Sequence, residues 1–96
     1  MIDESKLQRD ATRAARAQSL LENDLFNEAI ATIEADLVKA WKATPPRDTD
    51  GRERCWSAIQ QLGKIRGYFE TVLRDGQLAK AQLKELAERP KRSIFG

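Results

Sequence analysis

The first 44 residues contain neither glycine nor proline, which constrains the fold of this chain more than any other feature of its sequence. Five large apolar residues recur there at steps of four, three, four and four: Phe26, Ile30, Ile33, Leu37 and Trp41. This spacing places apolar side chains on one face of an α-helix. The sequence therefore predicts an amphipathic helix near residues 24–43, about 30 Å long.

The stretch from Thr44 to Glu53 predicts the end of this helix and the start of the next one. Pro45 disfavours helical backbone at Thr44, and Pro45-Pro46 prevents the helix from resuming at once. Asp50 and Glu53 then have the spacing of a capping box. We expect a second long helix over residues 50–75, with a stripe that faces the first: Ala58, Ile59, Leu62, Ile65, Phe69, Val72 and Leu73.

Two apolar stripes joined by a short loop indicate an antiparallel helical hairpin at residues 24–75. We expect its core to contain four residues from the centres of the two stripes: Ile33, Leu37, Leu62 and Phe69. The fold class predicted for residues 1–96 is a single all-α domain, in which the hairpin has a helix before it and a helical extension after it.

The flanking segments have weaker patterns. An alanine-rich helix is predicted at residues 4–22, with an apolar line that includes Ala11 and Ala14, and it should pack weakly or fray when isolated because alanine buries little area. Gly76 suits a helix C-cap or a kink. Helical character resumes at residues 77–89, Pro90 ends it, and residues 90–96 are expected to form a flexible tail.

Composition excludes several classes of function. The 96 residues include no histidine and one cysteine, so we expect no enzyme activity, no cofactor and no metal site. The net charge of +2 is too low for a dedicated nucleic-acid binder. No apolar run is long enough to cross a membrane and the first residues do not resemble a signal peptide, which favours the cytosol.

One feature of the second long helix is not explained by the hairpin. Trp56, Gly63 and Gly67 align on a side roughly 130° from the core stripe. Glycine inside a helix costs about 0.5–1 kcal/mol relative to alanine, so two of them beside a tryptophan suggest that another backbone approaches closely. Either the first helix or the C-terminal segment packs there, or a neighbouring subunit does. The small size of the chain favours a homo-oligomer with this line as its interface.

Two further sets of residues are candidates for binding. Ile94 and Phe95 follow basic residues in the predicted tail and have the character of a short motif that docks on a protein partner. Three basic residues near the bend could contact an anion: Arg47, Arg52 and Arg54.

Between Leu20 and Leu83 the sequence resembles a group of small α-helical proteins of tailed phages and prophages. The resemblance rests on Ala40-Trp41, Thr44, Arg52-Glu53, Trp56, Arg66 and the run Gly76-Gln77-Leu78-Ala79. It implies a phage-encoded protein in the bacterial cytoplasm or the virion, and it supplies no functional residues. We expect a non-enzymatic binding or assembly module that oligomerises and docks on a protein. The alternative is a phage regulator or anti-defence protein that binds a nucleotide signal or a host factor.

Overall fold

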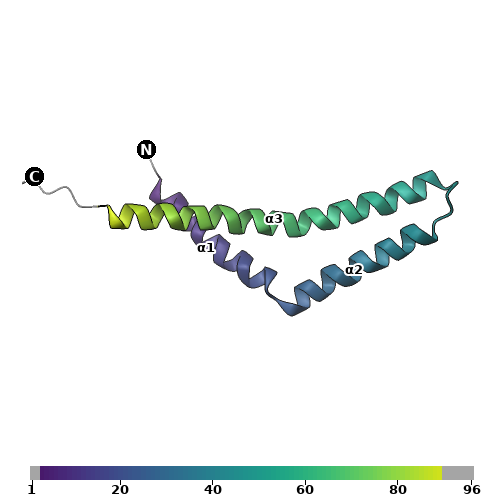
Figure 1. The fold of residues 1–96 in the computed structure, drawn as a ribbon, viewed down its shortest axis with the longest axis horizontal. Helices are drawn as coiled ribbons and strands as arrows, with labels where there is room; N and C mark the ends of the chain where they lie inside the picture. The colour runs from purple at the N-terminus through teal and green to yellow at the C-terminus, as the bar shows by residue number, and fades with distance from the viewer. Residues whose placement is uncertain (1–2, 90–96) are drawn as a thin grey trace, which may run out of the picture.

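The computed structural model describes residues 3–89, which form three helices: α1 (Glu4–Leu21), α2 (Asp24–Ala43) and α3 (Thr49–Glu88). This part of the chain contains no β-strand, so the predicted all-α fold is confirmed. α1 and α2 follow one another antiparallel to the 40-residue α3: α1 crosses its C-terminal half and α2 runs beside its N-terminal half (Figure 1). The molecule is a hairpin whose first arm is broken at residues 22–23.

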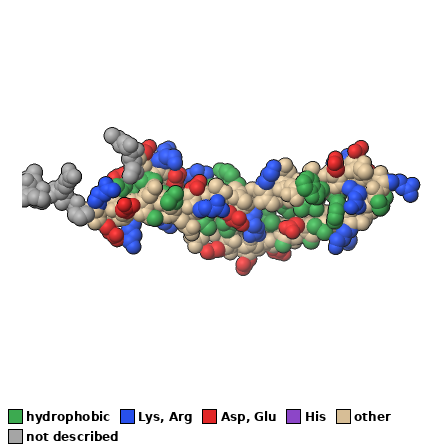
Figure 2. Space-filling view, turned by 45° about the horizontal axis from the view of Figure 1, so that its top comes forward, with side chains coloured by type: hydrophobic (Ala, Val, Ile, Leu, Met, Phe, Trp, Pro, Cys, Tyr) green, Lys and Arg blue, Asp and Glu red, His purple; other side chains and the backbone are tan. Residues whose placement is uncertain are grey.

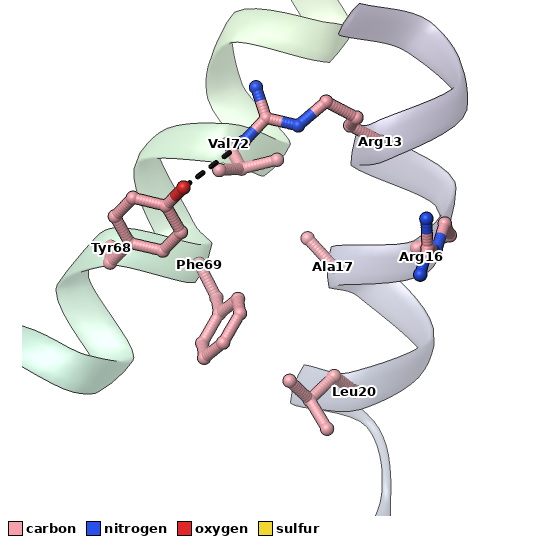
Figure 3. Close-up of a pocket in the computed structure, with 7 residues that line it drawn as sticks. All are labelled: Arg13, Arg16, Ala17, Leu20, Tyr68, Phe69 and Val72. Atoms are coloured by element: carbon pink, nitrogen blue, oxygen red, sulfur yellow. Dashed lines mark hydrogen bonds between the residues drawn. The ribbon is translucent and has the colours of Figure 1, made fainter. Parts of the chain in front are cut away.

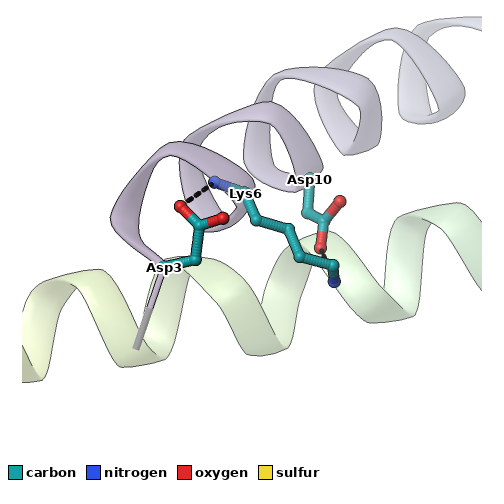
Figure 4. Close-up of polar contacts among 3 residues, drawn as sticks. All are labelled: Asp3, Lys6 and Asp10. Carbon is teal, nitrogen blue, oxygen red and sulfur yellow. Dashed lines mark hydrogen bonds and ion pairs between the residues drawn. The ribbon is translucent and has the colours of Figure 1, made fainter. Parts of the chain in front are cut away.

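Each helix starts at an acidic or amide side chain that accepts a backbone N–H. Asp3 accepts from Lys6, Asn23 from Phe26 and Asp48 from Gly51, at 2.9–3.2 Å. Figure 4 shows the first of these caps and the ion pair of Lys6 with Asp10, 3.2 Å apart. These bonds satisfy N–H groups that have no partner within the helix.

The cap of α3 lies two residues earlier than the sequence predicted, at Asp48 instead of Asp50. Gly51 explains this choice, because a Cβ atom there would overlap the Asp48 carboxylate. α2 ends as predicted: Thr44, before Pro45, has extended backbone with ψ 127°.

α3 continues without a break through Gly76, where the sequence suggested a cap or a kink. Gly76 is buried against α1: a Cβ atom there would overlap the Ala14 Cβ and lie 2.6 Å from the Asp10 carbonyl oxygen. Ala14, Ala17 and Ala79 are buried too. α1 therefore packs closely on α3, since small side chains allow the two backbones to approach.

Near the start of α2, an aromatic contact and a polar contact connect it to α3. The Phe26 and Phe69 rings lie edge to face with centroids 5.9 Å apart. The Asn27 side chain donates to the Leu21 carbonyl and accepts from Arg66, both at 2.8 Å. Asn27 thus connects the end of α1, the start of α2 and the middle of α3.

The predicted core of the hairpin is only partly correct. Leu62 is buried, Leu37 and Phe69 are half-buried, and Ile33 is 46% exposed. The reason is the shape: the extents are 79 × 27 × 15 Å, and the radius of gyration is 21.3 Å, whereas a compact chain of this length has about 12 Å. A layer of paired helices has no third element to cover the sides of its apolar stripes.

Candidate interaction surfaces

The part of the chain between residues 3 and 89 offers surfaces rather than a chemical centre. It contains no group of three or more His, Cys, Asp or Glu residues that could hold a metal ion. The residues buried in it are apolar side chains and one glycine. Figure 2 shows hydrophobic side chains at the surface between charged ones, most densely over the half where α2 pairs with α3. None of the three helices combines the length and the apolar character that a membrane span needs.

The predicted interface residues lie on the side of α3 that the other helices leave open. Trp56 is 56% exposed, and a Cβ atom added to Gly63 or to Gly67 would meet no atom within 4 Å. α1 packs at Gly76 instead, so the hypothesis that the first helix covers the glycines is wrong.

Leu78 extends this line and was missed in the sequence. It is exposed, and it follows Gly67 by eleven residues, as Gly67 follows Trp56. Eleven residues turn a helix by slightly more than three full turns, so Trp56, Gly67 and Leu78 lie on one side of α3. The predicted break at Gly76 had placed Leu78 in a separate helix, which hid this spacing. We call Trp56, Gly63, Gly67 and Leu78 the outer line.

A second exposed apolar surface surrounds the contact of Phe26 with Phe69. Ile33 lies two turns after Phe26, and Ile65 lies one turn before Phe69, so both share the side of the helix pair that this contact marks. Each is 46% exposed. Tyr68, 57% exposed, packs edge to face on Phe69 with centroids 5.5 Å apart. These five residues form what we call the Phe69 face.

At its α1 end the Phe69 face continues into a groove between α1 and α3 with a volume of about 420 Å³ (Figure 3). Its floor is apolar and consists of Ala17, Leu20, Phe69 and Val72. Arg13 reaches across it and donates to the Tyr68 hydroxyl at 3.1 Å, while Arg16 lies along the α1 side. The groove thus combines an apolar floor with a positively charged rim. Sequence reasoning missed it because the α1 arginines have no motif spacing.

The three predicted anion contacts do not share one environment. Arg52 is half-buried: its guanidinium lies 5.0 Å from the centre of the Trp41 ring and donates to the Thr44 carbonyl at 3.4 Å. Arg52 therefore closes the bend of the hairpin. Arg47 and Arg54 are exposed. The predicted docking residues of the tail, Ile94 and Phe95, lie outside the described residues.

Comparison of the chain with protein-family models, with curated proteins and with solved structures found no match.

Proposed function

We propose that this protein is a non-enzymatic helical assembly module, encoded by a phage or prophage, that self-associates and docks on a protein partner. The phage origin is inferred from the resemblance of residues 20–83 alone. Self-association is supported by the structure of residues 3–89, above all by the arrangement of Trp56 and Leu78 around Gly67.

The first support is the small core. The five buried hydrophobic residues are three alanines, Ile30 and Leu62, and no large side chain is fully buried among the described residues. Each alanine contributes little hydrophobic free energy, since that energy scales with the apolar area removed from water. A chain of this size commonly gains the missing stability by association.

The second support is the symmetry of the outer line. Trp56 and Leu78 each lie eleven residues from Gly67, which is about 16 Å along the helix. If two α3 helices cross antiparallel with a two-fold axis at Gly67, Trp56 of each copy lies opposite Leu78 of the other. The open positions at Gly63 and Gly67 allow the backbones to approach between these two contacts. The same surface is thus complementary to itself, as a two-fold interface requires.

Light scattering on wild type and Gly67→Leu tests this proposal. The leucine should lower the mass in solution and leave the helical circular dichroism unchanged, because its side chain fills space that the second backbone needs. Trp56→Ala should lower the mass as well. Ser19→Leu is the matched control: it adds the same side chain to an exposed position of α1, on the side away from α3, and should keep the wild-type mass. An unchanged mass in both Gly67→Leu and Trp56→Ala contradicts this interface.

Docking on a partner is proposed for Ile94 and Phe95. Deleting residues 91–96 should leave the mass and the melting temperature unchanged and weaken binding to the partner, whereas loss of helicity on deletion contradicts the proposal. The nucleotide-binding alternative is less well supported, because Arg52 stacks on Trp41. A melting temperature that rises on adding a nucleotide would favour that alternative.

A further inference from the structure

We propose that a second copy of this chain covers the Phe69 face, in an antiparallel two-fold arrangement separate from the outer line. The inference deepens the proposed self-association and rests on it. Three exposed large side chains lie on this face, Ile33, Ile65 and Tyr68, and exposed apolar patches of this kind mark interaction sites.

Arg16 and Asp36 lie beside the Phe69 face at positions where each could pair with the opposite charge of a second copy. Arg16 follows Ala14 by two residues, and Ala14 packs on Gly76, so Arg16 lies level with about residue 74 of α3. Asp36 follows Phe26 by ten residues, and Phe26 packs on Phe69, which puts Asp36 level with about residue 59.

Ile65 lies between these two levels, roughly 14 Å from one and 9 Å from the other along α3. A two-fold axis near Ile65 that runs across the face reverses the direction of the helices. It brings Arg16 of each copy opposite Asp36 of the other, and it stacks the Ile33, Ile65 and Tyr68 side chains of the two copies between these charges. A parallel arrangement would not pair them.

Both charges are available for such a pair. Arg16 and Asp36 are exposed, and the ion pairs formed among residues 3–89 are those of Lys6 with Asp10 and of Lys84 with Glu88. Asp36 lies one helical turn after Ile33, and Arg16 lines the groove that ends at Tyr68 and Phe69. Opposite charges at the two ends of an apolar face fix the register of an interface.

The chain's own C-terminal apolar residues do not fit this role. Phe95 is seven residues beyond Glu88, which spans at most about 25 Å even if fully extended. Ile65 lies 23 residues before Glu88 along α3, about 34 Å away. A second copy brings an apolar face of matching length and complementary charge.

Light scattering on charge variants of the full chain tests the inference. Arg16→Glu and Asp36→Arg each place like charges opposite one another at both ends of the interface and should weaken this contact about tenfold or more. The double variant Arg16→Glu/Asp36→Arg restores opposite charges and should recover the wild-type mass. Lys84→Glu is the control: it changes the charge as Arg16→Glu does, far from the face, and should have no effect.

Combining the substitutions distinguishes the contact at the Phe69 face from the contact at the outer line. If both exist, wild type is larger than a dimer, Arg16→Glu and Gly67→Leu each leave dimers, and Arg16→Glu/Gly67→Leu is a monomer. A mass that responds to Gly67→Leu but to neither charge variant overturns this inference and leaves the proposed self-association intact. A failure of the double charge variant to recover the mass also overturns it. A monomeric wild type overturns both.

Discussion

Gly76 of α3 packs directly on Ala14 of α1, so that a single added methyl group would overlap the alanine side chain. Ala14 is only 1% exposed, the lowest value among the core residues. The close packing of α1 on α3 therefore depends on a glycine that the sequence alone suggests as a helix end or a kink.

Replacing this glycine should destabilise the monomer. Gly76→Ala is expected to lower the free energy of unfolding by about 1–3 kcal/mol, because overpacking outweighs the gain of about 1 kcal/mol in helix propensity. Urea denaturation monitored by circular dichroism measures the effect. Gly63→Ala, where a Cβ atom meets nothing, should instead stabilise the dilute monomer by about 0.5–1 kcal/mol. Equal effects of the two substitutions would show that α1 does not pack at Gly76.

The hydrogen bond between Asn27 and Arg66 should contribute a measurable coupling free energy to the stability of the fold. Asn27→Ala removes both of its hydrogen bonds, to Leu21 and from Arg66, and should lower the free energy of unfolding by about 1–2 kcal/mol. In a double-mutant cycle with Arg66→Met, which keeps most of the aliphatic stem, the coupling should be about 1 kcal/mol. Additive losses would mean that Arg66 is a surface residue without a partner.

Asp48 and Asp50, both at the start of α3, should contribute differently to stability. Asp48→Ala should cost about 1 kcal/mol of unfolding free energy, because it removes the carboxylate that accepts the Gly51 N–H. Asp50→Ala should cost less than half of that, since Asp50 only interacts with the helix dipole at an exposed position. Thermal melting of the two variants compares them. A larger loss for Asp50→Ala would support the capping box of Asp50 and Glu53 that the sequence suggested.

The sequence predicts the helices better than their packing. Helical spacing defines α2 and Pro45 ends it, both as observed, because these signals are local. The role of Gly76 is not local: whether a glycine ends a helix or admits a neighbour depends on what lies opposite, here Ala14. The exposure of Ile33 is not local either, since no third helix among residues 3–89 covers that side.

The candidate surfaces also differ in whether local sequence signals or the packing of the helices define them. Three residues of the outer line, Trp56, Gly63 and Gly67, were predictable because their alignment needs only helix geometry. The Phe69 face requires the register of α2 against α3 and the position of α1, which brings Arg13 to Tyr68 across 55 residues of sequence. No spacing in the sequence encodes that register.

Sedimentation velocity of the wild-type chain over a concentration series tests most directly the claim that this protein self-associates. The monomer mass is 10.9 kDa. We predict a species of at least twice this mass at tens of micromolar, which dissociates on dilution as the apolar surfaces of Trp56, Ile65 and Leu78 return to water. A mass that stays at 10.9 kDa throughout the series would contradict the claim.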